Sequence, residues 1–158
     1  MDQARPKDSK KPEAGRDLLI WQWNCNGYQS KRATIIQHLE GIDRKPDIFV
    51  LQETHCIETP KLPGYRAHGK SAKTLSENKT GAHRPIGGVC TFVRKGIVFV
   101  EHELTTGNWT DSCAVEVIIG RRTKTSTLAV NVYSSTRHRK QKFRTLMQKA
   151  LRTIKKER

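Results

Sequence analysis

The sequence lacks two features that would place it in familiar classes: closely spaced cysteines and a long apolar run. Its four cysteines are too far apart for the spacing of zinc ligands. Three of them fall in or beside predicted strands, where small buried apolar side chains are expected. No apolar run is long enough to cross a membrane, and the polar first residues do not form a secretory signal. These absences exclude a membrane-spanning protein and predict an intracellular, reducing location.

Acidic and apolar side chains are also scarce. Hydrophobic residues make up 35% of the 158-residue chain, which indicates one domain with a modest core and some chain outside it. Only 15 acidic residues face 30 basic residues, so the formal net charge is +15. A surplus of this size favours a polyanion partner, most simply nucleic acid, and with it a nuclear location. A basic soluble protein without such a partner is the alternative.

The positive charge is concentrated at the end of the chain. Residues 137–158 contain ten Lys and Arg side chains against one acid, Glu157, and so supply nine of the fifteen net charges. Residues 1–17 are mixed in charge and contain no aromatic residue, and they are predicted to be a disordered tail. The basic residues predicted to contact nucleic acid are Arg137, Arg139, Lys140 and Lys142.

A strand, a helix and a second strand are predicted after the tail. Residues 18–23 and 47–51 are short apolar runs typical of buried strands. Between them, Ser30 is predicted to cap a helix with one apolar face, and Pro46 prevents the helix from continuing. The apolar face consists of Ile35, Ile36, Leu39 and Ile42. The short links predict a βαβ unit with parallel strands.

The second part of the chain has a different pattern. Residues 65–85 are polar and irregular, which is typical of a long functional or disordered loop. After this loop, β-branched runs separated by turn residues predict an antiparallel meander. The predicted strands are residues 89–93, 97–100, 113–119 and 127–132.

A helix is predicted over residues 143–154, where apolar side chains recur at positions i, i+3, i+4, i+7, i+8 and i+11. Most of its Lys and Arg residues fall outside this stripe. The simplest prediction is therefore a helix packed on a sheet, with a solvated basic face. A helix laid on DNA or on a membrane is the alternative.

Compact polar groups follow the first two predicted strands. The sequence Trp-Asn-Cys-Asn-Gly occupies residues 23–27, and Leu-Gln-Glu-Thr-His occupies residues 51–55. Because parallel strands end at the same edge of a sheet, Asn24, Asn26 and Glu53 are expected around one point, which suits a hard cation and a phosphate. Each motif also has a simpler interpretation: an ordinary turn for the first, and a surface or Arg-paired glutamate for the second.

A third polar residue, Tyr133, closes the last predicted strand, either as a phosphate contact or as a rim aromatic with its hydroxyl in water. With Gly-Gly-Val at residues 87–89 and Asn-Val-Tyr at residues 131–133, the ordered motifs resemble the endonuclease/exonuclease/phosphatase superfamily. The closest branch is the DNA endonuclease of non-LTR (LINE-type) retrotransposons, and the resemblance covers about residues 18–151. It implies an α/β (α+β) fold, in which two sheets pack as a sandwich with helices outside.

The resemblance also implies roles for individual residues. Glu53 matches the glutamate that binds Mg²⁺ or Mn²⁺, and Asn26 matches a position that assists it and is Asp in some members. Asn24 matches the asparagine that organises the scissile phosphate, and Tyr133 matches a tyrosine that contacts the phosphate. The implied activity is metal-dependent hydrolysis of DNA phosphodiester bonds. The implied partners are DNA and, in a full-length parent, a reverse-transcriptase domain, with no membrane involved.

The chain departs from the family's pattern in its later part. The family completes its site with a Gly-Asp-x-Asn element and a Ser-Asp-His element after the tyrosine strand, whereas this chain ends at Arg158. Asp111 is predicted to lie in a loop with the wrong neighbours, His138 is flanked by arginines, and Thr136 stands where related sequences often have Pro. Residues 18–158 are thus expected to be the N-terminal portion of the domain, incomplete at its C-terminus.

The expected consequence is an inactive fragment that binds metal weakly at best, because a positioned base and a second carboxylate are missing. An apolar sheet face and unpaired strand edges are expected to be exposed, which favours aggregation or partner binding. Two other functions remain open. One is a non-catalytic basic nucleic-acid-binding protein, and the other is a phosphatase-type member that acts on a phosphoinositide, a sphingolipid or an RNA tail.

Overall fold

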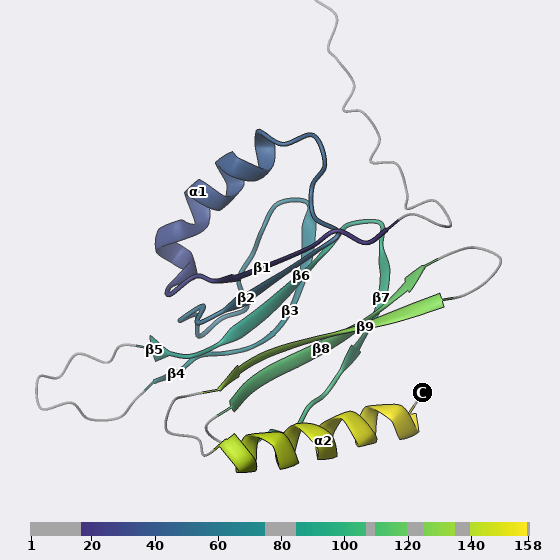
Figure 1. The fold of residues 1–158 in the computed structure, drawn as a ribbon. Coiled ribbons are helices and arrows are strands. Elements are labelled where there is room, and N and C mark those ends of the chain that lie inside the picture. The colour runs from purple at the N-terminus through teal and green to yellow at the C-terminus, as the bar shows by residue number, and fades with distance from the viewer. Residues whose placement is uncertain (1–16, 75–84, 107–109, 120–124, 135–139, 158) are drawn as a thin grey trace, which may run out of the picture.

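The chain folds into four layers, with two sheets stacked face to face and one helix on each outer side (Figure 1). The computed structural model describes residues 17–74, 85–106, 110–119, 125–134 and 140–157. This arrangement confirms the predicted α/β sandwich of two sheets with outer helices. The predicted disordered tail lies almost wholly outside the described residues. The elements in chain order are β1 (Ile20–Asn24), α1 (Tyr28–Glu40), β2 (Ile48–Gln52), β3 (Tyr65–Lys70), β4 (Lys73–Thr74), β5 (Pro85–Ile86), β6 (Val89–Arg94), β7 (Val98–His102), β8 (Thr110–Ile119), β9 (Thr125–Ser134) and α2 (Lys140–Glu157).

The first sheet has the strand order β1-β2-β6-β3. Strands β1 and β2 are parallel and are connected by α1, which confirms the predicted βαβ unit. Two predictions here were wrong. Strand β6 belongs to this sheet instead of the meander, because its apolar run is buried on both faces and needs a central position. Residues 65–70 form an edge strand paired with β6 instead of an irregular loop.

The second sheet is an antiparallel meander with the order β7-β8-β9, as predicted for these three strands. Its central strand β8 is buried along most of its length, and the β8–β9 pair is in register from Thr110 opposite Ser134 to Ile119 opposite Thr125. A separate two-stranded sheet is formed by β4 and β5. Strands β7 and β9 are the two edges of the meander.

Three apolar clusters fill the spaces between the four layers. The cluster under α1 brings Ile35 and Leu39 against the Phe49 and Phe92 rings of the first sheet. The cluster between the sheets includes Ile48 and Val93 on one side and Val115 and Val117 on the other. The cluster under α2 packs Ala150 and Ile154 on Ala114 and Leu128. The predicted amphipathic helix therefore lies on a sheet, as expected from its periodicity.

All four cysteines are buried and free, which confirms the prediction of small buried side chains. Burial raises the pKa of the Cys25 and Cys113 thiols to about 11, so both are neutral at physiological pH. The helices in the described part of the chain are all too short or too polar to cross a membrane.

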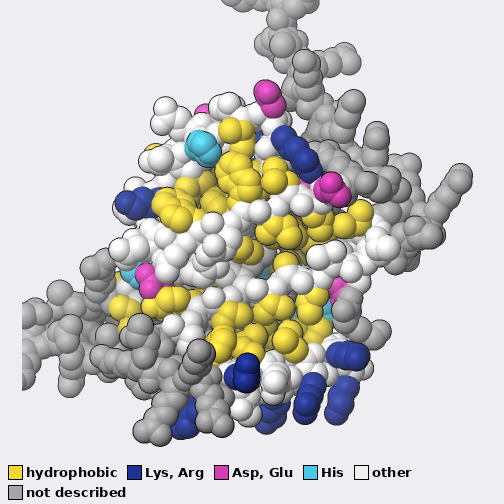
Figure 2. Space-filling view, in the orientation of Figure 1, with side chains coloured by type: hydrophobic (Ala, Val, Ile, Leu, Met, Phe, Trp, Pro, Cys, Tyr) yellow, Lys and Arg dark blue, Asp and Glu magenta, His cyan; other side chains and the backbone are white. Residues whose placement is uncertain are grey.

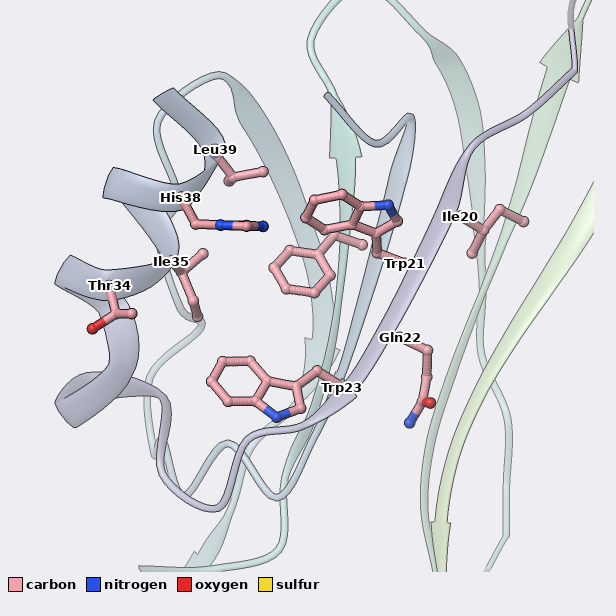
Figure 3. A pocket seen from close by; sticks show the side chains of 9 residues that line it. Ile20, Trp21, Gln22, Trp23, Thr34, Ile35, His38 and Leu39 are labelled. Carbon is pink, nitrogen blue, oxygen red and sulfur yellow. The ribbon is translucent and has the colours of Figure 1, made fainter. Parts of the chain in front are cut away.

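Exposed apolar side chains gather on two edge strands. Ile20 and Trp23 of β1 are 45% and 39% exposed, and Val98 and Val100 of β7 are also exposed. A groove between β1 and α1 is lined by Trp21, Trp23, Ile35 and Phe49, among others (Figure 3). Among the described strands, β1 pairs only with β2. The expected unpaired edge is therefore present, whereas both faces of the first sheet are covered, one by α1 and the other by the second sheet.

Candidate active site at the strand ends

The loops after β1 and β2 are held together by backbone hydrogen bonds. The N–H groups of Cys25, Gly27 and Tyr28 donate to the carbonyls of Gln52, Glu53 and Thr54 at 3.0, 2.8 and 2.9 Å. Because these bonds satisfy N–H groups at the start of α1, the helix needs no side-chain cap. Ser30 was wrongly predicted as the cap: it lies inside the first turn, and its hydroxyl donates to the Gly27 carbonyl at 3.0 Å.

A third loop, at the start of β6, supports the loops after β1 and β2. The N–H groups of Thr54 and His55 donate to the carbonyls of Gly88 and Gly87 at 3.1 and 2.9 Å. Both glycines have positive φ, 73° at Gly87 and 85° at Gly88. A β-carbon at Gly88 would lie 2.5 Å from Thr54 Oγ1, closer than atoms can approach. The Gly-Gly-Val motif thus lets the β6 backbone approach the loop that carries Glu53.

Three residues of these loops have left-handed backbones although they are not glycine. The φ angles are 44° at Asn26, 51° at Glu53 and 52° at His55. Such conformations cost about 1–3 kcal/mol each and persist only where surrounding contacts enforce them. Here the hydrogen bonds to Gly27, Gly87 and Gly88 provide that enforcement. Strain at this edge supports the prediction that the edge is functional.

Tyr133 reaches the same edge from the second sheet. Its hydrogen bond to the Glu53 carboxylate raises its pKa to about 12, with burial and the charges of Glu53 and Asp111 acting in the same direction. The phenol therefore stays protonated through the physiological range and donates its proton toward Glu53. Glu53 and Tyr133, 80 residues apart in the sequence, thus lie near each other at this edge.

A buried amide network fixes the two sheets relative to each other beside this contact. Gln52 Nε2 donates to Asn131 Oδ1 at 2.6 Å, and Gln22 donates to Gln52. Asn131 Nδ2 lies 3.0 and 3.1 Å from the carbonyl oxygens of Leu51 and Cys90. Gln52 precedes Glu53, and Asn131 lies two residues before Tyr133. Sequence reasoning missed this network, whose only signal is a polar residue inside each of two β-branched runs.

Asp111 was also misplaced by sequence reasoning. It lies in β8 instead of a loop, is 7% exposed, and stands directly opposite Tyr133 in the strand pairing. Its Oδ2 accepts the Gly88 N–H at 2.9 Å, and Lys70 Nζ lies 3.7 Å from Oδ1. The prediction failed because Gly, Asn, Asp and Ser, which are common in turns, occur together in residues 107–112, whereas pairing with β9 extends the strand through Asp111 and Ser112.

The structure brings some predicted site residues together and leaves others undescribed. Asn24 and Asn26 are exposed at the edge where Glu53 and Tyr133 meet, with Asn24 paired to Gln52. Their individual roles stay predictions. Among the predicted nucleic-acid contacts, Lys142 is exposed in the first turn of α2, and Lys140 begins that helix. The other two predicted contacts, Arg137 and Arg139, lie outside the described residues, as do Thr136 and His138.

The donor set at the edge suits a magnesium ion that is held partly by substrate. Within the described ranges, no three His, Cys, Asp or Glu side chains are grouped so as to hold a metal ion. Mg²⁺ commonly keeps several waters and takes only one or two carboxylates together with substrate phosphates. The described residues therefore do not form a tight all-protein metal site, and the Glu53 carboxylate is a ligand of the kind that a site completed by a phosphate uses.

Comparison with protein families gives a match over most of the chain. A model of the endonuclease/exonuclease/phosphatase family matches residues 21–157, from the second residue of β1 to the last residue of α2. The match includes the four predicted site residues at the ends of β1, β2 and β9, a region here called the strand-end edge: Asn24, Asn26, Glu53 and Tyr133. A comparison with curated proteins finds no match.

Proposed function

The chain belongs to the endonuclease/exonuclease/phosphatase family, and from this premise we propose that its strand-end edge binds a DNA phosphodiester, in the lineage of non-LTR retrotransposon endonucleases. The observation that carries the proposal is that Tyr133, from the second sheet, lies near Glu53 at the edge where Asn24 also ends its strand. The order of the Asn-x-Asn-Gly, Leu-Gln-Glu-Thr-His and Asn-Val-Tyr motifs supports this branch of the family.

Each residue at the edge has a proposed task. Glu53, assisted by Asn26, would hold Mg²⁺ or Mn²⁺, and the bound ion would supply positive charge beside the phosphate. The Tyr133 phenol donates a hydrogen bond, to Glu53 in the free protein and to a phosphate oxygen when DNA is bound. The amide of Asn24 orients the phosphate, because it can both donate and accept. The raised pKa of Tyr133 keeps it a donor at every physiological pH.

Charge supports DNA over a lipid headgroup as the partner. The net charge is +15, and exposed cations line the outer side of α2 (dark blue in Figure 2). A shallow groove on this face, here called the basic face, includes Lys149, Arg152 and Lys156. Its cations suit the phosphates of a long polyanion better than a single headgroup. A nuclear location and a reverse-transcriptase domain in a longer parent belong to the same proposal.

Two other functions differ from this one in their substrate. A non-catalytic basic binder would use the basic face alone, without the strand-end edge. A phosphatase-type member would use the edge on a phosphoinositide, a sphingolipid or an RNA tail. Reading the DNA downstream of the Arg158 codon separates the lineages: a reverse-transcriptase frame supports the retrotransposon branch, and a phosphatase-like continuation contradicts it.

Manganese binding tests the proposed edge directly. We expect the 158-residue chain to bind Mn²⁺ more tightly in the presence of a short DNA duplex. Glu53→Gln should weaken this binding of Mn²⁺ at least tenfold. Water-proton relaxation of Mn²⁺ provides the measurement. Glu40→Gln, at the exposed end of α1, is the matched control and should leave binding unchanged. Equal affinity in the two variants would remove Glu53 from the site.

Plasmid nicking tests catalysis by the chain alone. Since the family's Gly-Asp-x-Asn and Ser-Asp-His elements position its nucleophile, we expect the 158-residue chain with Mg²⁺ to nick supercoiled plasmid no faster than Glu53→Ala. Metal-dependent nicking that Glu53→Ala abolishes would contradict the proposed inactivity and support the proposed edge. Hydrolysis of a phosphoinositide but not of DNA would favour the phosphatase-type function.

A further inference from the structure

Asp111 is connected to the backbone of Glu53 through a short series of hydrogen bonds. Its Oδ2 accepts the Gly88 N–H at 2.9 Å. The carbonyls of Gly88 and Gly87 in turn accept the N–H groups of Thr54 and His55. Thr54 directly follows Glu53, whose backbone has the left-handed φ of 51°. A carboxylate on the second sheet therefore restrains a strained residue on the first.

The same carboxylate lies beside the other partner of Glu53. Asp111 and Tyr133 stand opposite each other in the β8–β9 pair, and the Tyr133 phenol bonds Glu53. Asp111 is thus linked to the Glu53 loop by hydrogen bonds through Gly88 and Thr54, and its strand partner Tyr133 lies near Glu53. The turn is tightly packed on this carboxylate, because a β-carbon at Gly87 would overlap Asp111 Oδ2.

We propose that Asp111 is a positioning residue of the strand-end edge, which fixes the Glu53 carboxylate against Tyr133 by holding the Gly87–Gly88 turn. It acts through Gly88: its Oδ2 accepts the Gly88 N–H at 2.9 Å, whereas its buried Oδ1 accepts no hydrogen bond from the described residues and forms an ion pair with Lys70 Nζ at 3.7 Å. The Lys70 charge offsets part of the cost of burying this carboxylate, and the bond to Gly88 fixes the carboxylate in place. The functional consequence rests on the proposed role of Glu53 in metal binding, whereas the geometric claim does not.

The opposite end of the first sheet offers a matched control. Asp47 is also buried, accepts a backbone N–H from Leu19 at 3.0 Å, and pairs with Arg94. Its environment repeats the chemistry of Asp111 at the edge that lacks Glu53. If Asp111 is only a stabilising buried carboxylate, replacing either residue will have the same kind of effect.

Amide hydrogen exchange separates the two roles. In Asp111→Ala, we expect the Thr54 and His55 amides to exchange about 10- to 100-fold faster, relative to the Phe92 amide of the core, because a charge-assisted bond is lost. Asp111→Asn keeps an acceptor for the Gly88 N–H and should restore most of the protection. Asp47→Ala should lower the overall stability without this local change.

Three results would overturn the proposal. One is unchanged relative protection of Thr54 and His55 in Asp111→Ala, and another is the same local loss in Asp47→Ala. The third is equal loosening in Asp111→Asn, which would show that the charge matters and the acceptor does not. If Asp111→Ala does not fold, Asp111→Asn is compared with the wild type instead. The proposal then requires that Asp111→Asn folds and that its Thr54 and His55 amides stay protected.

A second readout connects the positioning to the metal. We expect Asp111→Ala to weaken Mn²⁺ binding about tenfold and Asp47→Ala to leave it within about twofold, because only the first releases Glu53. Loss of protection with unchanged Mn²⁺ affinity would contradict the functional part of the inference. If the wild type binds no Mn²⁺, the proposed role of Glu53 fails, while the exchange data still decide whether Asp111 positions it.

Discussion

The strand-end edge and the basic face of α2 both carry groups suited to a polyanion, yet they are built in opposite ways. At the edge, three residues with strained backbones, of which Glu53 and His55 are half-buried, are held by hydrogen bonds between the loops of the first sheet. On α2, exposed cations follow from the period of a helix whose other side packs on the second sheet. Under the proposed function, the edge would therefore select a ligand by geometry, whereas the basic face would attract it through a field that depends little on any one residue.

The two regions should therefore respond differently to substitution. At the edge, an added atom or a lost acceptor changes the positions of several groups at once. On the basic face, a lost charge removes a share of the attraction for phosphates and leaves the fold unchanged.

The largest effect is expected for Gly88→Ala. The new β-carbon would lie 2.5 Å from Thr54 Oγ1 and 3.1 Å from the Ala72 amide nitrogen, at a φ of 85°. We expect the free energy of unfolding to fall by about 3 kcal/mol, from overlap and backbone strain together. Gly96→Ala is the control, because its φ is also positive but nothing lies within 4 Å of its β-carbon.

Urea unfolding monitored by tryptophan fluorescence measures both variants. Backbone strain alone should cost Gly96→Ala about 1 kcal/mol. Equal losses in the two variants would show that the β6 turn tolerates a side chain, and the edge would then be no more constrained than an ordinary hairpin turn.

The parts of the fold that sequence predicted are those set by local pattern. Helices α1 and α2 show the helical period of apolar residues, β1 and β2 are short apolar runs, and short links fix the parallel βαβ unit. The prediction that the first strand is buried was wrong, because β1 is an edge strand and four of its five residues are exposed. Strand β3 was missed because its sequence, Tyr-Arg-Ala-His-Gly-Lys, has no β-branched residue, and it is a strand only because β6 pairs with it.

The candidate site was predictable in its motifs and not in its support. Asn24 and Glu53 follow two neighbouring parallel strands, so their place at one edge follows from the strand directions, whereas Tyr133 comes from the other sheet and was placed only by the family resemblance. Asp111 and Asn131 make their contacts with partners more than 20 residues away, Gly88 for one and Gln52 for the other. No local pattern encodes such a pairing, because it depends on which sheet faces which.

An intermediate effect is expected for Glu53→Gln, which should change the pKa of Tyr133. Its pKa is raised to about 12, first by the hydrogen bond to Glu53, whereas burial is the first cause for Tyr28 and Tyr65, whose pKa values are also about 12. Because a folded pKa above the unfolded value favours the protonated form, Tyr133 stabilises the fold below about pH 10, and this contribution is lost as pH rises to about 12.

Glu53→Gln should lower the pKa of Tyr133 by about one unit and leave the other two tyrosines unchanged, since their shifts come from burial. Carbon-13 NMR of labelled tyrosine resolves the three phenols, and Tyr133→Phe assigns the signal. A uniform shift of all three, or of none, would contradict the contact between Glu53 and Tyr133.

The smallest effect on the fold is expected on the basic face. Replacing Lys149, Arg152 and Lys156 with Gln should change the free energy of unfolding by no more than about 0.5 kcal/mol, because all three side chains are exposed. If each contacts a phosphate, the slope of log affinity against log salt for duplex DNA should fall by about 2.7, from about 0.9 per contact. Glu53→Gln should leave that slope unchanged, because it removes no cation. A slope that responds to Glu53→Gln but not to the three replacements would place DNA at the edge alone, and the basic face would then be a solvated surface whose charge serves no contact.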